Sequence, residues 1–489
     1  MSKFLMDFQL MGNSSTFVTM YKYNLGSSVQ QMWDKYLVCN YFGKKKLKHV
    51  FVLAALLSVL SSCSSPRYLG RTSIPSDFLN HPAIFDTHAG IAIYDLQSKN
   101  YLYEYNSGKF FVPASNTKIA TLYAGLKYVG DAVPGIQYFD YNDTLFLKAT
   151  GDPTFLIRDF TPQLVLEFLQ DTKKNLAFIE SEWNTEALGY GWPWNFYLDY
   201  YMPERSPFPV YGNGIQWAQR EMAGLNDEVR ISYILSNPRH PWPVEIKDGD
   251  NELLIVSRPV NENNYIIYPG LDGARELFVP FHTNGLSSAV ELLRDTLHRE
   301  IDLLPDSHII PGNFQTIYSR PADSLFQPMM YNSDNFFAEQ TLLMASREMF
   351  GVMDEKKLIE HIIEYDFSGI PQKPRWVDGS GLSRYNLFSP LSIVWLLEKI
   401  ANEYGLDRIK SLLPTGNAGT LSGLYTGETG KIYAKTGTLG GNVVSLSGFI
   451  ITEKNRTLVF SVLINNHFKD SGDVRRAIES FLKEIIYRY

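Results

Sequence analysis

Alternating apolar and polar residues near both ends of the chain predict one antiparallel sheet. Residues 88–96 and 101–105 alternate in this way, and the four polar residues between them predict a hairpin turn. Toward the C-terminus, residues 431–435, 443–452 and 457–465 show strong strand patterns, and a polar turn joins the last two. We expect the N-terminal strands to join this C-terminal hairpin, so that the first and last segments build one domain.

Apolar positions at helical spacing predict four helices, around residues 116–128, 336–350, 390–404 and 473–489. Pro113 precedes the first helix, where its missing N–H leaves no hydrogen bond unmade.

Residues from about 140 to 310 differ in pattern and predict an insertion into this domain. They hold short strand-like runs at 143–149 and 253–258 and an aromatic, proline-rich tract at 189–213. Such aromatic residues form the core of a small domain more often than a carbohydrate platform, and we favour a core. The whole pattern predicts an α+β fold, in which an antiparallel sheet flanked by helices is interrupted by a β-rich region of one or two small domains.

The N-terminus carries the pattern of an export signal. A lysine-rich segment at 44–48 precedes an apolar run at 50–60, which is too short to cross a bilayer, since that needs roughly 20 residues. Ser61, Ser62 and Cys63 follow, and this order resembles a bacterial lipobox with Cys63 as the lipidated new N-terminus. The alternative is an ordinary signal cut nearby with an incidental cysteine.

Charge and composition exclude several classes of protein. The net charge is −7, and lysines outnumber aspartates seven to two in the first 62 residues, so the remainder is more acidic still. An acidic body without a Lys/Arg stripe argues against nucleic-acid binding. The nine histidines are scattered without ligand spacing, so we expect no metal and no cofactor.

Three short motifs carry candidate chemistry. Ser115 and Lys118 form an S-x-x-K tetrad, whose spacing puts both side chains on one helix face. A lysine with a depressed pKa can take the proton of a serine hydroxyl, which is otherwise a weak nucleophile. Ser333 and Asn335 fit S-x-N at a helix start, and Lys435 opens the K-T-G of this chain at a strand end.

Each motif alone is weak evidence, and chance copies occur. Residues 480–483 also fit S-x-x-K, and residues 98–100 also fit S-x-N. The joint match is much stronger, because the three motifs occur in the right order and on the elements that the chemistry needs.

With these motifs the chain resembles the penicillin-binding-protein and serine β-lactamase superfamily. It most resembles the D-Ala-D-Ala carboxypeptidase/endopeptidase family with a large insertion, the penicillin-binding protein 4 type. The segments that carry the resemblance are 112–118, 151–154, 333–340, 378–386, 419–421 and 434–439. The resemblance implies a β-lactamase/transpeptidase-like domain.

The resemblance also implies roles for the motif residues. Ser115 would attack the D-Ala-D-Ala carbonyl and form an acyl-enzyme, and Lys118 would accept its proton. Ser333 and Lys435 would relay a proton to the leaving nitrogen. Asn335 would hydrogen-bond Lys118 and the substrate amide.

Further residues would bind substrate. Thr436 would bind the terminal carboxylate, Gly437 would let the substrate lie along the strand, and the N–H of Thr438 would join that of Ser115 in an oxyanion hole. Asp152 and Arg384 are weaker candidates for binding a diaminopimelate side chain. For Asp152 a turn role, and for Arg384 a structural ion pair, are favoured over substrate contact.

The expected domain order follows from these assignments. Residues 1–62 would be leader and lipoprotein signal, 63–140 and 313–489 the two parts of the transpeptidase-like domain, and 141–312 the insertion. The expected partners are peptidoglycan peptides, β-lactams as covalent inhibitors, and a membrane reached through the lipid anchor. We expect a periplasmic protein held at the inner face of the outer membrane.

Two other functions remain open at this point. One is a serine β-lactamase or esterase on the same fold, and the other is a catalytically silent wall-binding lipoprotein. The long insertion and the segment 333–340 favour the carboxypeptidase, and the presence of every motif residue argues against the silent protein.

Overall fold

The predicted sheet is present, and it contains the first and the last strands of the described residues. The computed structural model describes residues 76–489 apart from 181–182, 224–229, 250, 272–274 and 306–311, so the leader and Cys63 lie outside the described residues. The strand order is β14-β15-β16-β1-β2. These strands are β1 (His88–Asp95), β2 (Asn100–Tyr105), β14 (Ile432–Leu439), β15 (Val443–Ile451) and β16 (Thr457–Asn465). β1 pairs antiparallel with β16 along its whole length, which confirms the predicted pairing of the N-terminal strands with the C-terminal hairpin.

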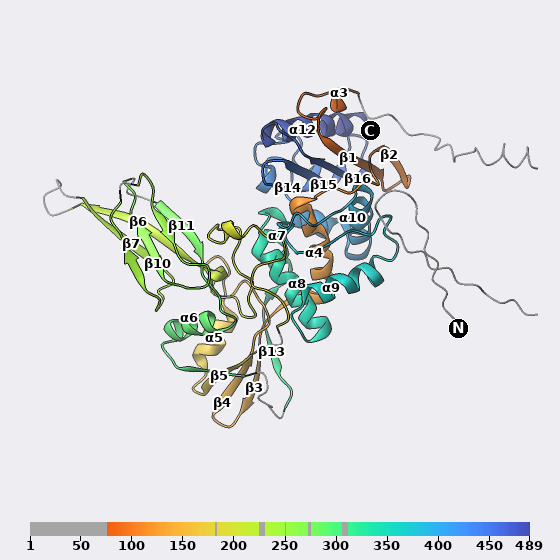
Figure 1. Cartoon of the computed structure of the whole chain (residues 1–489). Coiled ribbons are helices and arrows are strands. Elements are labelled where there is room, and N and C mark those ends of the chain that lie inside the picture. The colour runs from red at the N-terminus through yellow and green to blue at the C-terminus, as the bar shows by residue number, and fades with distance from the viewer. Residues whose placement is uncertain (1–75, 181–182, 224–229, 250, 272–274, 306–311) are drawn as a thin grey trace, which may run out of the picture. The chain divides into compact units, whose positions relative to one another are not determined.

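Helices cover both faces of this sheet, because successive side chains of a strand point to opposite sides. On β16, Phe460 and Val462 pack with the apolar face of α12 (Ser471–Arg488), beside α3 (Ser76–Leu79). Val459 and Leu463 point the other way, into a core shared with α10 (Pro390–Tyr404). Figure 1 shows α12 and α10 flanking the strands.

The helix predicted near 116–128 is built from three pieces. They are the 3₁₀ turn η1 (Ala114–Thr117), α4 (Lys118–Ala124) and the π-helical turn η2 (Gly125–Val129). The helix α8 (Asn335–Phe350) packs against α4 and η2. Asp334 caps α8 by accepting a hydrogen bond from Phe337 N, and Gly351 ends it in the left-handed conformation.

The remaining helices complete the core around α4 and α8. They are α7 (Asp323–Tyr331), α9 (Glu355–His361), the π-helical turn η5 (Ile362–Asp366) and α11 (Leu406–Leu412). The 3₁₀ turn η6 (Gly419–Leu421) packs instead through Leu421 into the core that contains α12.

A second five-stranded sheet lies between the two parts of this domain in the sequence. Its order is β12-β5-β4-β3-β13. The strands are β3 (Ala132–Tyr141), β4 (Thr144–Lys148), β5 (Asn175–Ile179), β12 (Ile301–Leu304) and β13 (Gln315–Pro321). The helices α5 (Leu164–Asp171) and α6 (Ser287–Leu297) share a separate hydrophobic core with this sheet.

Two three-stranded sheets complete the β-rich region that the pattern predicted. Their orders are β11-β6-β7 and β8-β10-β9. The strands are β6 (Gly214–Ala223), β7 (Arg230–Asn237), β8 (Val244–Ile246), β9 (Ile255–Ser257), β10 (Tyr265–Tyr268) and β11 (Arg275–Pro280). These additional sheets, with the helix-flanked antiparallel sheet, confirm the predicted α+β fold with inserted β structure.

The aromatic tract divides between core and surface. Phe208 is buried in the core of the second sheet, as predicted. The prediction of a core is wrong for Tyr190, Trp194 and Tyr200, which are mostly exposed. The tract contains the 3₁₀ turns η3 (Trp194–Phe196) and η4 (Tyr211–Asn213). The rest of its backbone is irregular, so its aromatic side chains do not all point toward one core.

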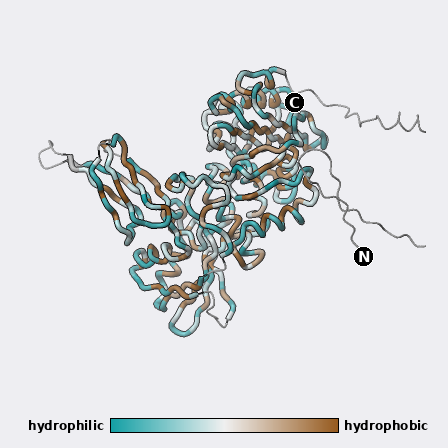
Figure 2. Tube along the Cα trace, viewed as in Figure 1, coloured by the Kyte–Doolittle hydropathy of each residue, from teal (hydrophilic) through white to brown (hydrophobic). Residues whose placement is uncertain are grey.

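Within the described residues, no helix combines the length and the apolar character needed to cross a membrane. Figure 2 shows short hydrophobic stretches interrupted by hydrophilic ones along the chain.

Candidate active site

The ammonium group of Lys118 lies at the centre of the candidate site. Its Nζ donates hydrogen bonds to Ser115 Oγ (3.0 Å), Asn335 Oδ1 (2.7 Å) and the carbonyl oxygen of Ser380 (2.8 Å). The turn η1 and the start of α4 place Ser115 and Lys118 on one face, as the S-x-x-K spacing predicts. All three donors of the lysine are therefore used, and one of the acceptors is the serine hydroxyl.

Burial lowers the pKa of Lys118 from its ordinary value to about 8. Desolvation disfavours the charged form, and this effect exceeds the opposing attraction of Asp334, Asp378 and Glu339. At pH 7 about a tenth of the protein then carries a neutral amine beside the serine hydroxyl. A neutral amine has a lone pair and can accept the hydroxyl proton.

The backbone around Ser115 is held in an unusual conformation. Ala114, directly before the serine, has φ 47°, and Gly381 has φ 84°. A Cβ atom at Gly381 would overlap the carbonyl oxygen of Ala114, so only glycine fits this contact. The segment that supplies the Ser380 carbonyl thus packs directly against the turn that carries Ser115. Strained backbone of this kind persists where its surroundings hold it, as at active sites.

A second lysine, Lys435, is buried beside Lys118. Burial lowers the pKa of Lys435 well below its ordinary value, and the charge of Lys118 lowers it further. Its Nζ donates to the carbonyl oxygen of Thr436 (2.8 Å). Asn116 Nδ2 donates to the carbonyl oxygen of Lys435 (2.9 Å) and so ties η1 to β14.

Gly437 lets β14 approach Ser115 closely. A Cβ atom there would overlap Ser445 Oγ and would lie 2.9 Å from the backbone nitrogen of Ser115. Ser445 Oγ donates in turn to the carbonyl oxygen of Pro113 (2.7 Å). The K-T-G strand is therefore in contact with the turn that carries Ser115.

The S-x-N segment enters the site from the start of α8. Asn335 reaches Lys118, as described above. Ser333 has φ 63°, is partly buried, and makes no hydrogen bond among the described residues. The predicted relay between Ser333 and Lys435 stays a prediction.

Two buried carboxylates, Glu339 and Asp378, lie near Lys118, and the sequence analysis predicted no role for them. Glu339 accepts a hydrogen bond from Ser380 N (2.7 Å) and pairs with Arg205 (3.4 Å). Asp378 accepts from Gly381 N and from Trp192 Nε1. Burial raises the pKa of Glu339 to about 7, and the charge of Asp378 raises it as well. Both residues lie in segments that carry the family resemblance, which was the one available signal.

The inserted region reaches the site directly. Asn335 Nδ2 donates to the carbonyl oxygen of Tyr201 (2.9 Å), in the aromatic tract. Gln340 Nε2 donates to the carbonyl oxygens of Gly151 (3.0 Å) and Ser206 (2.9 Å). Two side chains of α8 therefore hold the insertion in place.

The two weaker candidates occupy different surroundings. Asp152 is buried, and its Oδ1 accepts from the backbone and hydroxyl of Thr154 (2.8 and 2.7 Å). Burial raises the pKa of Asp152. Arg384 is exposed, lies against Gly440, and donates to Asn442 Oδ1 (3.2 Å), in the turn after β14. The structure connects neither residue to Lys118 by a hydrogen bond within the described chain.

No group of His, Cys, Asp and Glu side chains suited to a metal ion occurs in the part of the chain that the structure describes. The side chains described at this site carry hydroxyl, amine, amide and carboxylate groups.

The fold and the site together define an active-site-serine enzyme of the transpeptidase type, with a lysine beside the serine. The family model of D-Ala-D-Ala carboxypeptidase 3 (S13) matches residues 73–237 and 311–485. The chain belongs to this family of serine D-Ala-D-Ala carboxypeptidases.

Individual relatives agree with this assignment. The chain is 25% identical over 444 residues to the D-alanyl-D-alanine carboxypeptidase DacB of Haemophilus influenzae, covering 79% of this chain and 87% of that one. It is 23% identical over 468 residues to the D-alanyl-D-alanine carboxypeptidase of Actinomadura sp. strain R39, covering 84% and 83%. The crystal structure of penicillin binding protein 4 from Haemophilus influenzae superposes with a TM-score of 0.68 at 21% identity, covering 84% of this chain and 99% of that one. The fold is therefore shared.

The contact of Gly437 with the nucleophile turn predicts that Gly437→Ala lowers carboxypeptidase turnover at least ~100-fold, because a displacement of about 1 Å at the reacting groups can have that effect. Carboxypeptidase turnover is measured as the release of D-alanine from a D-Ala-D-Ala peptide. Gly427→Ala is the matched control, because a Cβ there meets nothing within 4 Å. Equal turnover of the two variants would show that β14 need not touch the Ser115 turn.

Proposed function

We propose that this chain cleaves the terminal D-Ala-D-Ala bond of peptidoglycan stem peptides through an acyl-enzyme on Ser115. The observation that carries the proposal is the 3.0 Å hydrogen bond between Ser115 Oγ and the buried Nζ of Lys118. A hydroxyl held by an amine whose pKa is near 8 has a base within reach at neutral pH.

The acylation step follows from these groups. Neutral Lys118 takes the proton of Ser115, and Oγ forms a bond to the scissile carbonyl carbon. The backbone N–H groups of Ser115 and Thr438 stabilise the oxyanion, since β14 lies against the nucleophile turn. The C–N bond then breaks, and a proton passes through Ser333 and Lys435 to the leaving D-Ala nitrogen. Water hydrolyses the ester and restores the serine.

Binding contacts are assigned by position. Asn335 holds Lys118 and the substrate amide, and Thr436 binds the terminal carboxylate. The structural ion pair expected for Arg384 is not found within the described chain, where its one side-chain partner is Asn442, and this exposed residue would therefore take a carboxylate of the stem-peptide side chain. Asp152 has a structural role instead, because it is buried and its carboxylate accepts from Thr154.

β-Lactams would acylate the same serine. The Haemophilus influenzae penicillin binding protein 4 has been solved in complex with a β-lactam, and its fold matches this chain with a TM-score of 0.62 at 20% identity. A β-lactam presents a strained amide to the hydroxyl and keeps its leaving nitrogen tethered.

Ser115→Ala is expected to abolish both D-alanine release and labelling by a fluorescent penicillin, because no other nucleophile bonds Lys118. Ser480→Ala, in the chance S-x-x-K copy on α12, is the matched control and should behave as wild type. A Ser115→Ala variant that still labels would refute the enzyme mechanism. Hydrolysis of benzylpenicillin faster than a D-Ala-D-Ala peptide by the wild type would favour a β-lactamase.

The pKa of Lys118 predicts the pH dependence of acylation. The base is the neutral amine, which is present above its pKa, so the acylation rate constant should rise about tenfold per pH unit below pH 8 and level off above it. Stopped-flow acylation by benzylpenicillin at a series of pH values measures this, with circular dichroism confirming the fold at each pH. A rate that is constant or falls between about pH 6 and 10 would contradict the assignment.

We further propose that residues 1–62 are an export signal and that Cys63 carries a lipid anchor at the periplasmic face of the outer membrane. The lysine-rich segment, the short apolar run and the position of Cys63 support this. A cell-wall substrate also requires an extracytoplasmic enzyme.

The lipid anchor predicts that wild-type protein sediments with membranes and incorporates labelled fatty acid, whereas Cys63→Ser does neither. Cys39→Ser is the matched control, because that cysteine lies within the proposed leader and would be removed. Labelled Cys63→Ser protein would contradict the anchor.

We propose a division into domains by sheet membership. The insertion would extend from β3 to β13, residues 132–321, because these strands share one sheet and one core. Both boundaries then lie about ten residues outside the segment 141–312 expected from the sequence.

A further inference from the structure

Arg475, on α12, reaches the strand that carries the K-T-G motif. Its NH2 group donates a hydrogen bond to Thr438 Oγ1 (2.6 Å). Its neighbour Arg476 pairs with Glu479 (2.9 Å). In contrast, no carboxylate of the described chain lies within ion-pair distance of Arg475. The guanidinium of Arg475, whose contact with Thr438 is open to solvent, therefore has no carboxylate partner within the described chain.

The position of Arg475 does not serve the stability of α12. It is the fifth residue of a helix that begins at Ser471. The helix dipole favours anions near that end and disfavours cations. An anion that arrives from solvent can therefore pair with this guanidinium, which has no carboxylate partner within the described chain.

The contact with Thr438 leaves binding capacity on both partners. A guanidinium has five N–H donors, and Arg475 uses one of them on Thr438. A hydroxyl has one hydrogen and two lone pairs, so accepting from Arg475 leaves the hydrogen of Thr438 free to donate. Thr438 is exposed and can be reached by a ligand.

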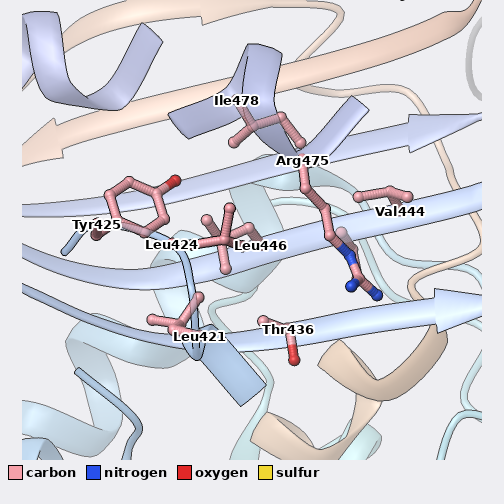
Figure 3. Close-up of a pocket in the computed structure, with 9 residues that line it drawn as sticks. Leu421, Leu424, Tyr425, Thr436, Val444, Leu446, Arg475 and Ile478 are labelled. Atoms are coloured by element: carbon pink, nitrogen blue, oxygen red, sulfur yellow. The ribbon is translucent and has the colours of Figure 1, made fainter. Parts of the chain in front are cut away.

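Arg475 also shares a pocket with Thr436. Figure 3 shows the Arg475 side chain extending from α12 across the sheet toward β14, where Thr436 lies. The apolar side chains of Leu421, Leu446 and Ile478 line the same pocket.

We propose that Arg475 binds the carboxylate on the leaving side of the scissile bond, together with Thr436 and Thr438. The inference rests on the proposed function, since it assigns a substrate group to the same site. A carboxylate accepts two hydrogen bonds from a guanidinium fork, which fixes its orientation. Arg475 is thus a residue that selects substrates whose leaving group ends in a carboxylate.

Two synthetic substrates separate this role from a structural one. One is an N-acyl-D-alanyl thioester of thioglycolate, in which the carboxylate lies two bonds from the leaving sulfur, as it does from the leaving nitrogen of D-Ala. The other is its methyl ester, which lacks the charge. The reactive thioester keeps hydrolysis measurable without the carboxylate.

We expect Arg475→Ala to lower kcat/KM for the acid about 10- to 100-fold, the range for a hydrogen bond to a charged group. Its kcat/KM for the methyl ester should stay within about twofold of wild type. Arg475→Lys should recover part of the loss, because it keeps the charge but not the fork. Arg476→Ala is the matched control and should leave both substrates unchanged.

An equal loss on both substrates would overturn the inference, because Arg475 would then only support β14. No loss on either substrate would overturn it as well. A wild-type protein that hydrolyses neither thioester, and is not labelled by a fluorescent penicillin, would overturn the proposed function itself.

Discussion

The side chains of Lys118, on α4, and Lys435, on the edge strand β14, are both fully buried in the site, and the rest of the site depends on this. Taking an ammonium group out of water disfavours its charge, and a second ammonium nearby disfavours it further. Burial lowers the pKa of Lys118, and burial together with the charge of Lys118 lowers the pKa of Lys435. The protonation of Lys435 therefore depends on the charge of Lys118 beside it. The mechanism that we propose, with Lys118 as the base of Ser115, depends on this burial.

Hydrogen bonds and an ion pair around Lys118 hold the buried groups in place. Glu339 and Asp378 fix the segment whose Ser380 carbonyl accepts from Lys118, and Arg205 from the inserted region pairs with Glu339. The insertion is thus joined to the catalytic domain through the same buried charges that position the base. Carboxylates near a lysine would ordinarily raise its pKa, and here burial outweighs them. The site therefore balances attraction against desolvation, which a sequence does not display.

Local patterns predicted most of the fold and the motif residues. Strand alternation predicted the sheet in which His88 pairs with Asn465, and helical spacing predicted α8 and α12. The network of Glu339, Asp378 and Arg205 was not predicted, because its members lie far apart in the sequence and their burial depends on tertiary packing. The contact of Arg475 with Thr438 was not predicted either. Periodicity predicts that Arg475 lies on a helix, but the packing of α12 on the sheet determines that it contacts Thr438.

The most direct test of the central claim is the pKa of Lys118 itself. Lysine labelled with ¹³C at Cε and ¹⁵N at Nζ can be followed by NMR across a pH series, with Lys118→Arg assigning the signal. We predict that the Lys118 resonance titrates near pH 8. A titration near the ordinary lysine value of 10.5 would show a charged lysine at neutral pH and would contradict its role as the base.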